Sequence, residues 1–166
     1  HLLPSAKKVG LFVDAEDAAI AAALAHLPLD ILQFHGEESP DRVRDARKKF
    51  NLPVMKAIKI AGPEDVEAAS AYFEAADSLL FDAKPPAKMK KTLPGGNALA
   101  FDWKLIAGRD WPLPWMLSGG LAVENLAVAV KTSGTRAVDV SSGVEDEPGR
   151  KSPAKIRAFI QAAARL

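Results

Sequence analysis

The sequence predicts a parallel α/β fold, and three observations support this. First, the chain has short apolar runs rich in β-branched or bulky residues, which are typical of buried strands. Second, the segments between these runs carry apolar residues at helical spacing. Third, the runs begin about 20–25 residues apart, except for one longer gap before Trp115, as repeated βα units require. The predicted strands are residues 9–13, 31–34, 54–58, 79–81, 115–117 and 137–140.

The helices are predicted from caps and from apolar periodicity. The first follows Asp14, a candidate N-cap, because Ile20 and Leu24 recur at helical spacing. Ser39-Pro40 has the form of an N-cap followed by proline at the first helical position. Further helices are predicted after Gly62-Pro63, after Gly119-Gly120 and from Ser152-Pro153 to Ala163. We therefore expect six strands alternating with six helices.

One connection departs from this rhythm. Residues 83–100 are rich in Lys, Pro and Gly, and connections of this length are usually functional lids or disordered segments. Its lysines favour a solvated surface over an anion-binding one.

Composition limits the function classes. The 166 residues (17.7 kDa) suit one domain, residues 1–166, and 22 Lys+Arg against 21 Asp+Glu leave a net charge of +1. Nucleic-acid binding usually needs a clustered basic excess, so we expect no nucleic-acid partner. No apolar run approaches the roughly 20 residues of a membrane span, and the first residues do not resemble a signal peptide. Cysteine is absent. We expect a cytoplasmic protein with no membrane partner.

Two parallel architectures compete, a doubly wound sheet and a (β/α)₈ barrel. Polar residues follow nearly every predicted strand, among them Asp14, His35, Lys59 and Asp82. This distribution favours a barrel mouth, where all loops meet at one site, over a single switch point. No Gly-x-Gly-x-x-Gly follows the first strand and no Walker-type Gly-Lys-Ser/Thr is present, so a nucleotide site is disfavoured.

The last two loops predict a phosphate site. Gly119-Gly120 and Ser141-Ser142-Gly143 each come before a predicted helix or turn. Small residues let backbone N–H groups approach an anion, and barrels commonly bind phosphate at these two strands. Either turn alone is also explained as a helix cap. Together they favour a phosphorylated small molecule as partner.

Several runs resemble one enzyme family. They are Gln33-Phe34-His35-Gly36-Glu37-Glu38, Leu80-Phe81-Asp82-Ala83-Lys84, Gly95-Gly96-Asn97, Phe101-Asp102-Trp103, Leu117-Ser118-Gly119-Gly120-Leu121 and Val138-Asp139-Val140-Ser141-Ser142-Gly143-Val144-Glu145. In this order they resemble phosphoribosylanthranilate isomerase of tryptophan biosynthesis, from about Val9 to the last helix. The resemblance implies the TIM-barrel family, with strands 3–8 and their helices represented here as one partial barrel domain that lacks the first two βα units.

The resemblance also implies a reaction, an acid/base Amadori rearrangement of N-(5-phosphoribosyl)anthranilate to 1-(2-carboxyphenylamino)-1-deoxyribulose 5-phosphate. The general acid maps onto Asp82, whose partial burial would raise its pKa. The sequence alone would favour a helix-capping Asp, and the resemblance reverses that preference. His35 and Asp139 map onto substrate-facing strand ends, although a structural role for His35 stays open. Gly119, Gly120, Ser141, Ser142 and Gly143 form the implied phosphate cradle.

Other positions are expected to carry no chemistry. Asp102 before Trp103 is interpreted as an N-cap with a packed aromatic ring. Three dispersed histidines without carboxylate companions predict no metal site, and no cofactor is expected.

The family's general base is a cysteine and its anthranilate-carboxylate contact an arginine, both in the unmatched N-terminal units. A second hypothesis is therefore a non-catalytic partial barrel that binds phosphate ligands or assembles through open strand edges. A third is another phosphate-binding barrel isomerase or synthase, which lacks the matched runs. We expect a monomer or a homodimer.

Overall fold

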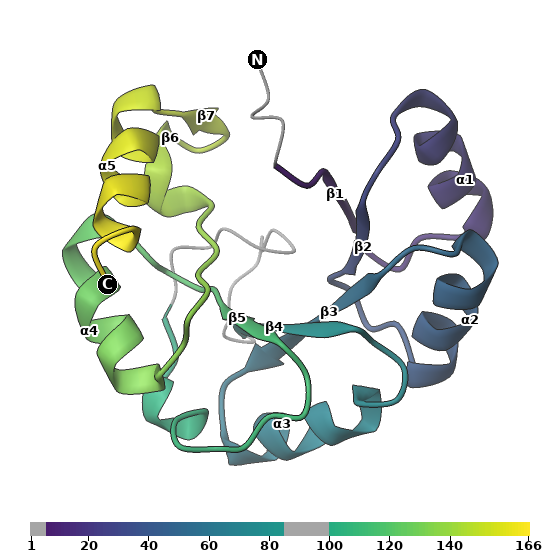
Figure 1. The fold of residues 1–166 in the computed structure, drawn as a ribbon, viewed down its shortest axis with the longest axis horizontal. Helices are drawn as coiled ribbons and strands as arrows, with labels where there is room; N and C mark the ends of the chain where they lie inside the picture. Colours follow the sequence, from purple (N-terminus) through teal and green to yellow (C-terminus); the bar gives the residue numbers. More distant parts are fainter. Residues whose placement is uncertain (1–5, 85–99) are drawn as a thin grey trace.

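The computed structural model describes residues 6–84 and 100–166 and contains the predicted parallel sheet. The sheet is curved, and its helices lie on the convex side, so that the ribbon forms an incomplete ring (Figure 1). In sheet order the strands are β1 (Val9–Phe12), β2 (Ile31–Phe34), β3 (Val54–Ile60), β4 (Ser78–Ala83) and β5 (Trp115–Leu117). The helices are α1 (Asp17–His26), α2 (Pro40–Phe50), α3 (Pro63–Ala68), α4 (Val123–Ser133) and α5 (Pro153–Ala163).

The two faces of the sheet bury different side chains because residues alternate along a strand. Leu32, Phe34 and Val54 pack with helix residues such as Ile20 and Val43. Met55, Ala57 and Leu80 instead form a small cluster with strand residues only, which identifies the concave face. The inward-facing side chains of successive strands therefore converge inside the ring.

The predicted strand at residues 137–140 forms only in part, as a single parallel bridge beside β5. Only Val138 bridges to β5, at Leu117, although the main chain of Asp139 and Ala137 also bonds with Leu117. The hydroxyl of Thr135 competes for the local backbone, since it donates to the Ala137 carbonyl and accepts the Ala137 N–H. The backbone then turns sharply at Ser141 (φ −120°, ψ −82°).

Of the N-caps predicted for the first two helices, Ser39 is confirmed and Asp14 is not. Ser39 caps α2 as expected and accepts the N–H of Arg42 at 3.2 Å. Asp14 does not cap α1, which begins at Asp17 after Glu16; its carboxylate instead accepts the N–H of Glu37 at 2.7 Å. A short acidic side chain can either cap a helix or accept a hydrogen bond from a neighbouring loop, so the sequence alone does not show which role Asp14 takes.

All five α-helices whose positions were predicted form, and a sixth is not found among the described residues. The described residues contain five, and three single turns of 3₁₀ helix: η1 (Ala69–Tyr72), which continues α3, η2 (Trp103–Leu105) and η3 (Ser142–Val144). Asp102 does cap η2, since it accepts the N–H of Lys104. Most of the 83–100 connection, including the Gly95-Gly96-Asn97 run, lies outside the described residues.

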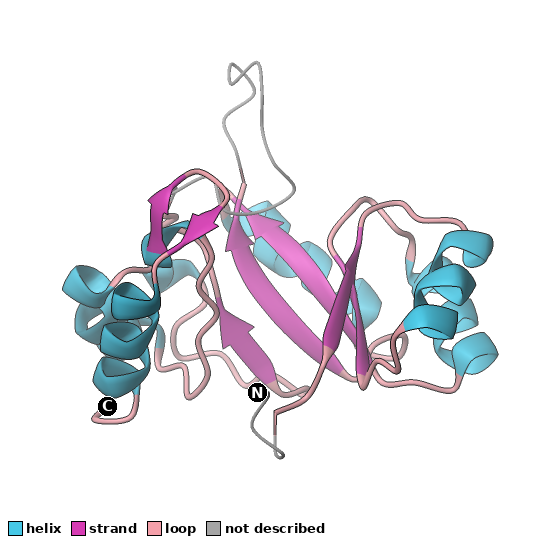
Figure 2. Cartoon of the chain, turned by 90° about the horizontal axis from the view of Figure 1, so that it is seen from above, coloured by secondary structure: helices cyan, strands magenta, loops and turns pink. Residues whose placement is uncertain are grey.

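An antiparallel hairpin that was not predicted follows η3. It consists of β6 (Glu145–Glu147) and β7 (Arg150–Lys151), turned at Gly149, whose φ of 81° suits glycine. Figure 2 shows it on the side of the ring toward which the strands point. Within residues 6–84 and 100–166, no helix combines the length and the apolar character needed to cross a membrane.

Candidate active site

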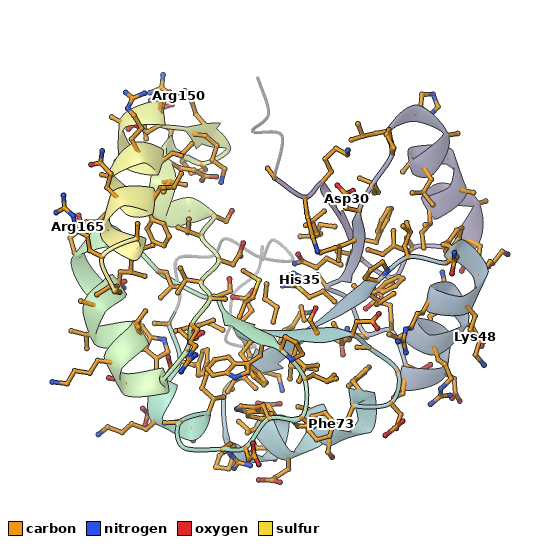
Figure 3. All side chains as sticks on the ribbon, in the orientation of Figure 1. Asp30, His35, Lys48, Phe73, Arg150 and Arg165 are labelled. Carbon is orange, nitrogen blue, oxygen red and sulfur yellow. The ribbon has the colours of Figure 1, made fainter. Side chains whose placement is uncertain are left out.

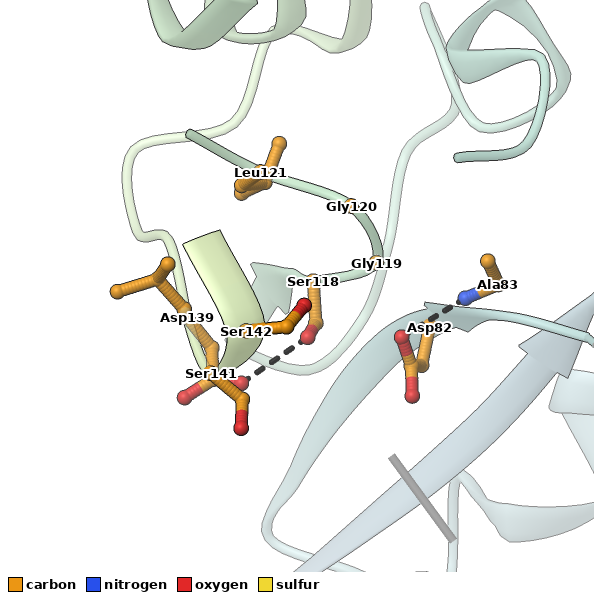
Figure 4. Close-up of a pocket in the computed structure, with 10 residues that line it drawn as sticks. Asp82, Ala83, Ser118, Gly119, Gly120, Leu121, Asp139, Ser141 and Ser142 are labelled. Carbon is orange, nitrogen blue, oxygen red and sulfur yellow. Dashed lines mark hydrogen bonds between the residues drawn. The ribbon is translucent and has the colours of Figure 1, made fainter. Parts of the chain in front are cut away.

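A pocket lies where the carboxyl ends of β4 and β5 meet the segment that follows Val138 (Figure 4). This is the end at which parallel α/β folds place their ligands, because every strand-to-helix loop points there. Its walls are Asp82, Ala83, Ser118, Gly119, Gly120, Leu121, Asp139, Val140, Ser141 and Ser142. The structure thus brings together six of the eight residues predicted for the site.

His35 and Asp82 meet across an intervening strand. His35 directly follows β2 and points into the ring (Figure 3), and its Nε2 lies 3.0 Å from Oδ2 of Asp82 on β4. They are only 3% and 5% exposed. The concave-face residue of β3 beside Leu80 is Ala57, whose methyl group leaves room for this contact.

Asp82 keeps its second oxygen close to its own backbone. Oδ1 accepts the N–H of Ala83 at 2.9 Å, so both carboxyl oxygens are oriented by hydrogen bonds. The carboxyl group is therefore fixed in place at the wall of the pocket, as a proton-transfer group must be.

Asp139 is the second carboxyl group of the pocket. Its Oδ2 accepts the hydroxyl of Ser118 at 3.0 Å. Burial is the largest influence and raises the pKa of Asp139, the negative charge of Asp82 raises it further, and the Ser118 hydrogen bond opposes both. The net pKa lies above the ordinary value for aspartate. Two carboxyl groups here share one poorly solvated pocket.

Two glycines allow the pocket walls to approach closely. Gly119 has a φ of 89°, and a Cβ there would lie 2.7 Å from the Ala83 nitrogen. A Cβ on Gly143 would lie 1.9 Å from the Leu121 carbonyl oxygen. Gly143 does not line the pocket but holds η3 against the Gly119–Leu121 loop, which explains its place in the predicted cradle.

A buried ion pair next to the site was missed by sequence reasoning. Lys56 and Glu38 are 2% and 5% exposed and lie 2.8 Å apart. Lys56 also donates to the Gly36 carbonyl, and Glu38 accepts the N–H groups of Asp14 and Gly36. Burial raises the pKa of Glu38, but the Lys56 and Asp14 hydrogen bonds outweigh it, so the net pKa is lowered. A Lys within an apolar strand was the available signal.

Lys151 was not predicted as a site residue, and the structure places it against the Ser141 turn. Its ammonium group donates to the Ser141 carbonyl at 2.9 Å and pairs with Glu145 at 2.7 Å. It therefore braces the turn that begins η3. In the described part of the chain, no three His, Asp or Glu side chains are grouped as a metal site would require.

Comparisons with known proteins decide the family. A family model described as N-(5′phosphoribosyl)anthranilate (PRA) isomerase matches residues 2–162. The chain belongs to this family. N-(5′-phosphoribosyl)anthranilate isomerase of Paramagnetospirillum magneticum is 55% identical over 156 residues, which are 94% of this chain and 72% of that protein.

Solved structures of the family share the fold. Phosphoribosyl anthranilate isomerase from Thermotoga maritima superposes with a TM-score of 0.84 at 36% identity, over 99% of this chain and 76% of that one. A family structure in complex with reduced 1-(o-carboxyphenylamino)-1-deoxyribulose 5-phosphate gives a TM-score of 0.78 at 33% identity, over 99% and 75%. These relatives are (β/α)₈ barrels, so the predicted fold class is confirmed.

The buried ion pair predicts a large stability loss when one partner is removed. Lys56→Met keeps the length of the side chain but leaves the Glu38 carboxylate buried without its cation. We expect a loss of about 3–5 kcal/mol in the free energy of unfolding, measured by urea denaturation. Lys48→Met is the matched control on the outward side of α2 (Figure 3), with an expected change within about 0.5 kcal/mol. Equal effects of the two substitutions would contradict the account.

The raised pKa of Asp139 predicts a pH-dependent stability difference. Between the ordinary aspartate value of 3.8 and the raised native value, the native state binds more protons than the unfolded state, so Asp139 lowers stability as pH rises. Asp139→Asn keeps the acceptor for Ser118 and removes the charge. Its stability relative to the wild type should therefore increase with pH through this window and then level off.

Asp30→Asn provides the control of opposite sign. The N–H of Lys8 donates to Asp30 and lowers its pKa, so this variant should lose stability relative to the wild type as pH rises through that range. Chemical denaturation at a series of pH values measures both differences. A flat or inverted curve for Asp139→Asn would refute the burial argument.

Proposed function

We infer that the protein is an isomerase of tryptophan biosynthesis that converts N-(5-phosphoribosyl)anthranilate to 1-(2-carboxyphenylamino)-1-deoxyribulose 5-phosphate. The observation that carries this inference is a buried, hydrogen-bonded Asp82 in the wall of a glycine- and serine-lined pocket, in a chain of the PRA isomerase family. Residues 1–166 act in this proposal as one partial barrel domain.

Asp82 is the general acid in the proposed reaction. It protonates the furanose ring oxygen, the ring opens to an iminium ion, a base removes the proton from C2, and the enolamine tautomerises to the ketone. The fixed position of Asp82 and its burial support this role, because a carboxylic acid poised to give up a proton needs both a defined direction and a low-dielectric setting. Asp139 would accept substrate hydroxyl groups, and His35 would act on the substrate through Asp82.

The phosphate group would bind between Gly119-Gly120 and Ser141-Ser142-Gly143. The first N–H groups of a helix have no partner within it, and here η3 and α4 begin beside these residues. Lys151, which is paired with Glu145, holds the Ser141 carbonyl from behind the cradle. Ser141 and Ser142 lie across the pocket from Asp82, whereas Gly119 adjoins it (Figure 4). The distance from the serines to the acid suits a substrate with its phosphate at one end of the ribose.

The general base is not among the residues assigned here. The resemblance gives that role to a cysteine and the anthranilate-carboxylate contact to an arginine, and the 166 residues contain no cysteine. We place both in the part of the family length that the match does not include, about a quarter of the Thermotoga chain. The reaction as proposed uses no cofactor and takes place in the cytoplasm.

Asp82→Asn tests the acid directly. The variant keeps the shape of the side chain but loses the ionisable proton and has one acceptor oxygen for the N–H groups of His35 and Ala83. Turnover of the full-length protein should therefore fall by about 10²- to 10⁴-fold. The control is Asp102→Asn, which changes the same group at the N-cap of η2 outside the pocket. Conversion is followed by chromatographic separation of substrate and product, and near-wild-type turnover of Asp82→Asn would exclude it as the acid.

The second candidate is a partial barrel that assembles through its strand edges. Among the described residues β1 has a neighbour on one side only, and Val9, Leu11 and Val13 are 43%, 52% and 39% exposed. Such an edge favours pairing with another chain. Sedimentation of the 17.7 kDa chain discriminates: concentration-dependent assembly supports this candidate, whereas a monodisperse monomer counts against it.

A further inference from the structure

Gln33 lies behind His35, on the side opposite to Asp82. Its Nε2 is 3.0 Å from Nδ1 of His35, while Nε2 of His35 is 3.0 Å from Asp82. Residues 33 and 35 are two positions apart, so both side chains leave the same face. Gln33, at 9% exposed, is buried like its two partners. The three groups form one chain of hydrogen bonds from β2 to β4.

The order of donors and acceptors in this chain fixes the proton on the imidazole ring. The amide of Gln33 is oriented with its nitrogen toward Nδ1 of His35. Because an amide nitrogen only donates, this orientation makes Nδ1 the acceptor, without a proton. The remaining proton then lies on Nε2 and is donated to Oδ2 of Asp82. A doubly protonated ring would set an N–H of His35 against the N–H of Gln33, which is costly in a buried site.

The charge of His35 matters for Asp82. An imidazolium 3.0 Å away would hold Asp82 as a carboxylate, because an opposite charge at that distance strongly favours the ionised form. A neutral donor orients Asp82 without placing a positive charge beside it. We propose that Gln33 is a positioning residue that holds His35 as its neutral Nε2–H tautomer, so that Asp82 stays available as a proton donor. The consequence for turnover rests on the proposed function, in which Asp82 is the acid.

The other charged groups near His35 either favour the protonated ring or are already paired. Asp139, beyond β5, faces Asp82 and His35 across the pocket, and with Asp82 it favours a cationic ring. On β3, Lys59 is the register partner of Asp82 and pairs with Glu37 at 3.1 Å. Two carboxyl groups thus attract a proton to His35, and the amide of Gln33 is the group that opposes it.

The test reads the ring nitrogens of His35 by ¹⁵N NMR at pH 7. The chain has three histidines, and His35→Asn assigns the signals by their loss. In the wild type we expect a protonated Nε2 and an unprotonated Nδ1. In Gln33→Glu the new carboxylate accepts from Nδ1, so both nitrogens should be protonated. A wild-type ring with its proton on Nδ1, or a Gln33→Glu ring that stays neutral, would overturn the proposal.

Turnover gives a second, separate measurement. In Gln33→Glu, kcat should fall by about 100-fold, the scale on which a misplaced catalytic group costs rate, while KM stays unchanged because Gln33 does not line the pocket. Gln161→Glu makes the same chemical change on the exposed face of α5 and should leave both constants unaltered. A fall confined to KM, or none, would contradict the positioning role.

Gln33→Leu serves as a second variant in case Gln33→Glu does not fold. It removes the amide donor without adding a charge, so His35 should lose its single tautomer and show protonation of Nδ1 as well. An unchanged Nε2–H ring in Gln33→Leu would refute the role of Gln33. The two proposals can fail separately. If Asp82→Asn stays active while the wild type and the Gln33 variants give the predicted His35 signals, Asp82 is not the acid but the role of Gln33 stands. If Asp82→Asn is inactive and the His35 signals differ from those predicted, the acid stands and the role of Gln33 is refuted.

Discussion

The buried pair of Lys56 and Glu38 is the interaction on which the site depends. It connects the ends of β1 and β2 to the interior of β3, because Glu38 accepts backbone N–H groups of Asp14 and Gly36 while Lys56 donates to the Gly36 carbonyl. A buried charge pair is tolerated only when its remaining hydrogen-bonding groups are satisfied, and these are. The loop directly after His35 is thereby held to β3, and the position of His35 against Asp82 follows from it.

The curvature of the sheet then determines what the site contains. Side chains on the concave face crowd toward one another, and the small Ala57 lets His35 contact Asp82 across β3. On the other side of the pocket, glycines at 119 and 143 bring backbone against backbone. The acid end of the pocket is therefore built from side chains, because the acid must exchange a proton. The proposed phosphate end is built from main chain, because the phosphate only has to be bound.

The parallel α/β class and the residues of the pocket were predictable, because each strand end leaves a short sequence signal and all strand ends converge. Asp82, Asp139, Ser141 and Ser142 were found in this way. The Lys56–Glu38 pair and the Gln33 contact were not, since a pairing across strands depends on register and on which face a residue takes. The strand at residues 137–140 is reduced to one bridge for a local reason, because the Thr135 hydroxyl takes the Ala137 N–H.

The central claim is that Asp82 and the Ser141–Gly143 turn face the two ends of one substrate. A crystal structure with reduced 1-(o-carboxyphenylamino)-1-deoxyribulose 5-phosphate, the compound bound in a solved family member, tests it most directly. The account predicts the phosphate on the N–H groups of Gly119-Gly120 and Ser142-Gly143, with Asp82 within hydrogen-bond distance of the ribulose oxygens. A phosphate bound elsewhere, or a ligand that does not reach Asp82, would contradict it.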